Sequence, residues 1–217
     1  MKYYELNHLK CRREDRRRQI VSEYNMEVII FTRLLNGETR TSDTGDTLTD
    51  VYYEFLCTKK DNEKEKYIII CGRPTGKNFI ELAGLENPRF FDPYVGILNN
   101  ERNNNEQNNN EGNKGNRNVQ KRWNPLAIEL YNAINLLAIS WGKTLYGRLL
   151  KIKQDVEKYY YQEPFESKIE YVNSCIGYDS KKRKLSDMIE ELREQGNNIR
   201  EFEFPLIEGI LGDRSNF

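Results

Sequence analysis

The longest regular pattern of apolar positions spans residues 123–161. Apolar side chains recur there in steps of three or four, the spacing of one helix face: Leu126, Leu130, Ala133, Leu137, Trp141, Leu145, Leu149, Ile152, Val156 and Tyr159. Asn124 followed by Pro125 is a favourable helix start, and Pro164 ends the pattern. A glycine costs a helix about 1 kcal/mol relative to alanine. The pattern therefore predicts one long helix, or two collinear helices, with a bend or break near Gly142.

Three earlier segments are rich in β-branched and aromatic residues, which favour strands. They are Glu27–Leu35, Val51–Thr58 and Tyr67–Cys71. The connection between the last two is short and charged, whereas parallel strands need a crossover of about a dozen residues or more. These two segments are therefore predicted to form an antiparallel hairpin. Residues 5–24 are predicted to form a basic N-terminal helix, and the polar residues before Val51 a loop.

Four further elements are predicted from shorter patterns. Phe79–Leu85 favours a short helix that ends near Gly84, and Lys168–Ile176 favours a strand. A helix capped by Asp179 or Ser180 is expected to run through Leu192 to Gly196. Alternating aromatic and acidic residues predict an edge strand over Phe202–Leu206.

These elements predict an α+β fold with one small, mostly antiparallel sheet packed against the long helix. An N-terminal basic helix and a C-terminal helix–strand complete this fold. Residues 99–118 contain no apolar residue and are rich in asparagine, so they cannot bury enough surface to offset the entropy of ordering. We expect a single domain over residues 1–217, interrupted by a disordered Asn-rich insertion at 99–118.

Composition narrows the class of protein. Lysine plus arginine and aspartate plus glutamate each number 34, so the formal net charge is zero and nucleic-acid binding would need a local patch. The longest apolar runs fall short of about 18 residues and the N-terminus lacks an apolar signal segment, so we expect a cytoplasmic protein with no membrane span. The four scattered cysteines are expected to be free thiols that pack as small apolar residues. With His8 as the single histidine, no metal and no cofactor are expected.

A phosphate-binding loop is the sharpest chemical candidate. The order strand, glycine-rich turn, helix is the one in which backbone amides surround an anion; the candidate residues are Gly72, Arg73, Thr75, Gly76 and Lys77. Two features depart from the nucleotide-binding motif, because Cys71 occupies the first glycine position and Asn78 replaces the magnesium-binding hydroxyl residue. A second Gly-Lys-Thr, at residues 142–144, falls within the helical pattern. Nucleotide binding, binding of a simple anion and an ordinary turn all remain open for residues 72–77.

The order helix, three strands, helix over the first 85 residues resembles the core of restriction-endonuclease-like nucleases. That resemblance implies an Asp on the second strand and an acid-x-Lys on the third, which together bind a metal ion. Asp50 and Glu54 could serve on the second strand. The third strand, Tyr67–Cys71, carries no acid, so the resemblance implies either a nuclease or an inactive relative.

Binding without chemistry is the function that the sequence favours. Two basic clusters could contact nucleic acid or an acidic partner: Arg12, Arg13, Arg16, Arg17 and Arg18, and then Lys181, Lys182, Arg183 and Lys184. The charged second half of the long helix is expected to protrude and to end in a docking surface at residues 159–161. We predict a non-enzymatic binding or assembly protein with a protein partner or self-association, and with nucleic acid as a further candidate partner.

Overall fold

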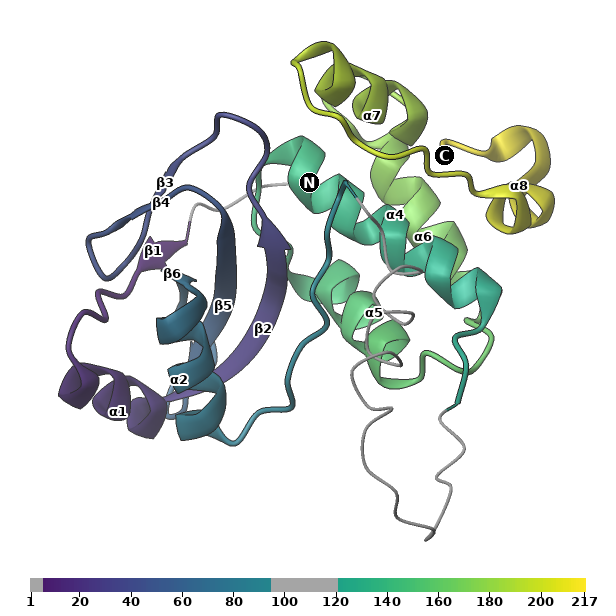
Figure 1. Cartoon of the computed structure of the whole chain (residues 1–217). Coiled ribbons are helices and arrows are strands. Elements are labelled where there is room, and N and C mark those ends of the chain that lie inside the picture. The colour runs from purple at the N-terminus through teal and green to yellow at the C-terminus, as the bar shows by residue number, and fades with distance from the viewer. Residues whose placement is uncertain (1–5, 95–120) are drawn as a thin grey trace, which may run out of the picture. The chain divides into compact units, whose positions relative to one another are not determined.

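The computed structural model describes residues 6–94 and 121–217. Contacts between Cα atoms divide the chain into two compact units (Figure 1). Unit 1 comprises Met1–Phe91 with Thr144–Tyr146, and unit 2 comprises Asp92–Lys143 with Gly147–Phe217. The expectation of a single domain over residues 1–217 stays a prediction, and the expected insertion at 99–118 lies outside the described residues.

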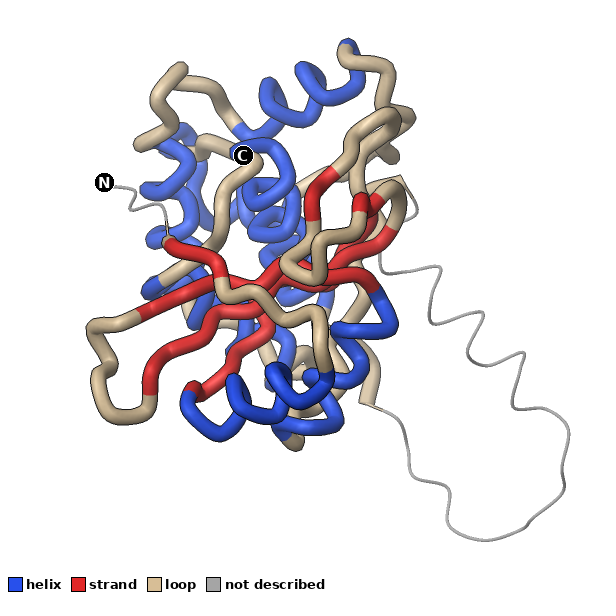
Figure 2. The backbone as a smooth tube through the Cα atoms, turned by 90° about the vertical axis from the view of Figure 1, so that its left-hand side faces the viewer, coloured by secondary structure: helices blue, strands red, loops and turns tan. Residues whose placement is uncertain are grey.

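Unit 1 is built on a four-stranded, mostly antiparallel sheet (Figure 2, red). Its strands in spatial order are β1 (Asn7–His8), β6 (Lys66–Gly72), β5 (Val51–Lys59) and β2 (Tyr24–Arg33). The β2–β5 and β5–β6 pairs are antiparallel, and β1 lies parallel to β6. The three predicted strands, their hairpin and the α+β class are thereby confirmed. The polar segment expected to be a loop contains a second, two-stranded sheet of β3 (Arg40–Thr41) and β4 (Thr47–Leu48).

Two helices cover one face of the sheet. They are α1 (Glu14–Glu23) and α2 (Arg73–Ala83), which pack on each other and on the strands. Ile20 of α1 and Phe79 of α2 are fully buried against Phe55 and Ile69 of the sheet. These two helices cover their face of the sheet from within unit 1, whereas the long apolar pattern forms helices of unit 2.

The long apolar pattern forms two helices of unit 2, α4 (Pro125–Trp141) and α5 (Gly147–Lys158). The Asn124 side chain accepts hydrogen bonds from two amides of the first turn of α4, and α4 ends at Gly142, whose φ is +58°. The predicted start and the predicted break are confirmed. The collinear, protruding arrangement is wrong, because α5 folds back along α4 and the Asn124 amide donates to the Tyr160 carbonyl at 2.9 Å (Figure 1).

Three further helices complete the described part of unit 2. They are α6 (Glu166–Gly177), α7 (Leu185–Glu194) and α8 (Pro205–Leu211), the last followed by a 3-10 turn, η1 (Gly212–Arg214). The predicted strand over Lys168–Ile176 is wrong, since Ile169, Val172 and Ile176 bury one face at helical spacing.

The predicted C-terminal strand is also wrong. Phe202 to Phe204 form an irregular segment, and Pro205 occupies the first position of α8. The Glu129 carboxylate of α4 accepts hydrogen bonds from the free amides of Leu206 and Ile207 at 3.0–3.2 Å. A buried carboxylate at a helix N-terminus stabilises that helix, and this tertiary contact overrides the local strand pattern.

The cysteines and the helix lengths agree with what the composition predicts. All four cysteines are buried and unbridged, which confirms their reading as free thiols, and burial raises the pKa of Cys11 to about 12. Over the residues that the structure describes, every helix is too short or too polar to cross a membrane.

Candidate functional site

The residues of the predicted phosphate loop lie inside α2. Gly72 ends β6 and caps the helix, so Arg73 to Lys77 form its first turns and leave no loop to surround an anion. Gly76 is buried against the Tyr53 ring, where an added Cβ would lie 2.2 Å from the nearest ring carbon. The glycine therefore serves close packing of helix on strand, and the loop geometry expected of these residues is wrong. Anion binding at this helix end stays a prediction.

The second Gly-Lys-Thr occupies the connection between α4 and α5. Gly142 takes the left-handed conformation that ends α4, and Thr144 belongs to unit 1. The Thr144 hydroxyl donates a hydrogen bond to the Glu54 carboxylate. This hydroxyl is engaged by the sheet, and no phosphate-cradling turn precedes it.

The two acids of the nuclease hypothesis have different surroundings. Asp50 is exposed and lies 3.5 Å from the Arg33 guanidinium, whereas Glu54 is only 4% exposed on the central strand β5. Burial raises the pKa of Glu54, against the lowering effect of Thr144. Among the described residues, no three His, Cys, Asp or Glu side chains are grouped to hold a metal ion. A catalytic role for Asp50 or Glu54 stays a prediction.

The single histidine is part of an ion-pair cluster that the sequence did not indicate. His8 Nδ1 lies 2.9 Å from one oxygen of Asp43, and Lys10 Nζ lies 3.1 Å from the other. The Asp43 carboxylate is buried and also accepts from the Ile70 amide at 2.8 Å. Three groups thus converge on one carboxylate and join β1, β6 and the turn before β4. No spacing rule relates residues 35 positions apart, so only the fold brings them together.

The first basic cluster spans the residues directly before α1 and the first turns of that helix, and it is partly neutralised there. Arg18 pairs with Glu14 at 2.6 Å, and the Arg17 guanidinium donates to Asn78 of α2 and to two backbone carbonyls. Arg16 donates to a glutamine one turn along. The side chains of Arg12 and Arg13 make no hydrogen bond or ion pair within the described residues, so they are the cations of this cluster left for a partner.

The second basic cluster precedes α7 and is largely structural. Arg183 makes ion pairs with Asp179 at 2.9 Å and with Glu191 at 2.5 Å, and Lys181 lies 3.5 Å from Glu191. The hydrogen bonds from Arg183 hold the pKa of Asp179 well below its usual range. The structure therefore disperses Lys181, Lys182, Arg183 and Lys184 around a turn and engages two of them internally.

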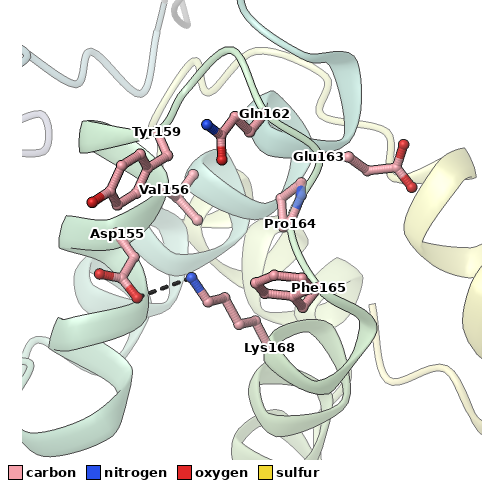
Figure 3. A pocket seen from close by; sticks show the side chains of 8 residues that line it. All are labelled: Asp155, Val156, Tyr159, Gln162, Glu163, Pro164, Phe165 and Lys168. Atoms are coloured by element: carbon pink, nitrogen blue, oxygen red, sulfur yellow. Dashed lines mark hydrogen bonds and ion pairs between the residues drawn. The ribbon is translucent and has the colours of Figure 1, made fainter.

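A surface pocket of about 250 Å³ lies between α5 and α6 of unit 2 (Figure 3). One wall is formed by Asp155 and Val156 in the last turn of α5 and by Tyr159, which directly follows that helix. The other wall is the connection into α6 and its first turn, in particular Phe165 and Lys168. The lining is completed by Gln162, Glu163 and Pro164.

The pocket combines exposed aromatic rings with an ion pair. Phe165 is 75% exposed and Tyr159 is 43% exposed, although both belong to residue types that folding normally buries. Lys168 Nζ lies 2.9 Å from Asp155 Oδ2, drawn as a dashed line in Figure 3, and 5.9 Å from the centre of the Phe165 ring. The site can thus offer apolar contact, a carboxylate and an ammonium group within one small hollow.

Part of this pocket is predictable from the sequence. Residues 159–161 were expected to form a docking surface, and Tyr159 does line the pocket, but Tyr160 packs on Trp123 with ring centres 5.3 Å apart. Phe165 was missed, because its exposure depends on the angle at which the chain leaves α5 and enters α6. An aromatic residue directly after a proline at a helix start was the available clue.

A second, more open pocket lies beside the N-terminal turns of α4. Its lining includes Glu129, Arg200, Phe202 and Pro205, and its volume is about 620 Å³. The Glu129 carboxylate is already bonded to the first amides of α8. The Glu129 carboxylate in this pocket is therefore already used to stabilise α8.

Comparison with known proteins gives a family without an activity. A family model described as "uncharacterised conserved protein UCP028583" matches residues 10–215, so the chain belongs to that family. No curated protein and no solved structure matches the chain.

Proposed function

We propose that this member of the UCP028583 family is a non-enzymatic binding or assembly protein that docks a protein partner on the α5–α6 pocket. The observation that carries the proposal is the pair of exposed rings, Phe165 and Tyr159, on the walls of one pocket. Clustered exposed aromatic side chains mark interaction surfaces, because their burial supplies much of the binding free energy of a protein interface.

The backbone around these rings supports the proposal. The Tyr159 amide donates to the Asp155 carbonyl at 2.9 Å, the Gln162 amide to the Tyr159 carbonyl at 2.8 Å, and the Lys168 amide to the Phe165 carbonyl at 2.9 Å. Pro164 further restricts the chain immediately before Phe165. A surface that is held in place before binding loses less conformational entropy when it docks.

Site-specific photo-crosslinking tests this proposal in cells that express the full chain. A benzoylphenylalanine residue in place of Phe165 is expected to give discrete adducts, because a docked partner lies against that ring. The same replacement at the exposed Glu190 of α7 is the control. An adduct of twice the chain mass would identify self-association, and identical adduct patterns at both positions would contradict docking at the pocket.

Nucleic acid is the second candidate partner, and the observation that favours it is the pair of unengaged arginines, Arg12 and Arg13, directly before α1. Backbone phosphates bind such cations in a salt-dependent manner. If this reading holds, an Arg12→Gln/Arg13→Gln double variant should bind short duplexes more weakly and with a salt slope lower by about two. Arg18→Gln, which removes an arginine already paired with Glu14, is the matched control in the same fluorescence-anisotropy titration.

The phosphate-binding and nuclease alternatives stay untested predictions. Residues 73–77 are helical, and the third strand of the nuclease-like core carries no acid. Neither alternative has a described group of residues that favours it over docking.

A further inference from the structure

Lys168 reveals the chemistry that the pocket favours, because it is a cationic side chain already seated there. Its ammonium pairs with the Asp155 carboxylate at 2.9 Å and lies 5.9 Å from the Phe165 ring centre. A second ammonium, that of Lys158, lies 5.5 Å from the centre of the Tyr159 ring. A cation within about 6 Å of an aromatic centre is attracted by the ring quadrupole. Both exposed rings of the pocket thus already have a cation beside them.

The pocket lining contains one more carboxylate than ammonium groups. Asp155 and Glu163 supply two negative groups, and Lys168 supplies one positive group. The Glu163 carboxylate makes no hydrogen bond or ion pair within the described residues, and it lies on the opposite side of Pro164 from Asp155 in Figure 3. The eight lining residues therefore carry one excess negative charge beside apolar ring surface, and Lys158, whose ammonium lies beside the Tyr159 ring, is outside this lining.

Resting on the docking function proposed above, we propose that the α5–α6 pocket accepts a basic side chain of a partner protein, an arginine in preference to a lysine. The partner's guanidinium stacks on the Phe165 ring and pairs with Asp155 or Glu163. Arginine is preferred because its planar group stacks on aromatic faces and donates two parallel hydrogen bonds to one carboxylate. Lys168 is then an internal competitor, which the incoming group displaces from Asp155.

The test uses the full chain and three nine-residue glycine–serine peptides that differ only at the central residue. That residue is arginine, lysine or citrulline, and citrulline keeps the shape of arginine without its charge. Binding is followed by amide chemical-shift titration, which reports weak affinities and locates the contact. The arginine peptide is expected to shift the amides around the pocket and to bind at least tenfold more tightly than the citrulline peptide.

Lys168→Met gives the sharpest expectation, because it removes the internal competitor while keeping an unbranched side chain of similar length. Affinity for the arginine peptide should rise about tenfold, equivalent to about 1.4 kcal/mol, while the citrulline peptide should show no change. A purely structural role of Lys168 would not produce a gain of affinity. An unchanged or weaker affinity for the arginine peptide would overturn the assignment of Lys168 as competitor and, with it, the proposed site.

Three variants separate this inference from the docking function on which it rests. Phe165→Ala and Glu163→Gln should each lower the affinity for the arginine peptide at least threefold. The neighbouring surface variant Glu166→Gln should leave that affinity unchanged. If all three peptides bind equally and lose affinity only with Phe165→Ala, the result supports docking at the pocket and contradicts its selectivity for a basic side chain. If none of the peptides binds, the selectivity fails as well, and the crosslinking at position 165 decides docking independently.

Discussion

Gly76 illustrates how a single missing side chain sets the distance between a helix and a strand. Its neighbour is the Tyr53 ring, which stacks in turn on Phe31 with ring centres 3.9 Å apart. Gly76→Ala would force a methyl group into that ring, and such overpacking costs about 1–3 kcal/mol. We expect a lower midpoint in urea unfolding with an unchanged slope.

A second helical glycine provides the control for this prediction. Gly209 of α8 has open space where its Cβ would lie. Gly209→Ala should therefore leave stability unchanged or raise it by up to about 1 kcal/mol, the helix propensity difference. Equal destabilisation by both substitutions would contradict the packing role assigned to Gly76.

Glu54 is a residue whose burial makes stability depend on pH. Since burial raises its pKa in the folded state, the folded chain retains a proton that the unfolded chain releases. Its contribution to stability is therefore complete below the unfolded pKa and is lost as the pH rises through the folded pKa. Glu54→Gln keeps a hydrogen-bond acceptor for Thr144 but does not titrate.

The Glu54→Gln variant should accordingly lose less stability than the wild type as the pH rises above about 4, the ordinary pKa of a glutamate, as measured by urea unfolding at each pH. Asp50→Asn is the comparison. Because Asp50 is exposed, this substitution should leave the slope of stability against pH nearly unchanged. Parallel pH profiles for the wild type and Glu54→Gln would show that Glu54 keeps an ordinary pKa.

At the scale of elements, Asp179 holds the ends of three helices together. It accepts from Trp141 at the end of α4, and from Arg183 and the Lys181 amide in the turn between α6 and α7. Removing one partner of a buried ion pair costs about 3–5 kcal/mol. Asp179→Asn is therefore expected to lower the unfolding free energy at neutral pH by about 3 kcal/mol.

The pH dependence of this effect has the opposite sign to that of Glu54. The folded pKa of Asp179 is lowered, so its contribution is present above the unfolded pKa and is lost as the pH falls through the folded pKa. The difference between the wild type and Asp179→Asn should therefore shrink in acid. A difference that stays constant from neutral to strongly acidic pH would contradict the ion-pair role.

The elements also differ in how far local sequence predicts them. Asn124, Pro125 and Gly142 are strong local signals, and the helix start and break that they predict are confirmed. The segments at 168–176 and 202–206 have few such signals, and both were predicted as strands. In α6 the buried positions follow a helical period, and α8 is stabilised by Glu129 from another helix. Short apolar patterns fit a helix or a strand, so distant contacts decide between them.

At the scale of the whole molecule, the prediction that residues 99–118 are an insertion outside the core can be tested by replacing their sequence. Those residues include no apolar side chain, so replacing them with a glycine–serine segment of equal length removes no apolar surface from a core. The replacement should shift the melting temperature by less than about 2 °C. A large fall would show that the asparagine-rich sequence itself stabilises the fold.

The sequence by itself determined the α+β class, the β5–β6 hairpin and the main helix boundaries of α4, because these depend on residues near one another in the chain. Tertiary structure alone decided that α5 folds back on α4, that Asp43 gathers His8 and Lys10, and that Phe165 stays exposed beside Lys168. The physical reason is that periodicity and capping act within a few residues. Burial and charge pairing join residues that only the folded chain brings into contact.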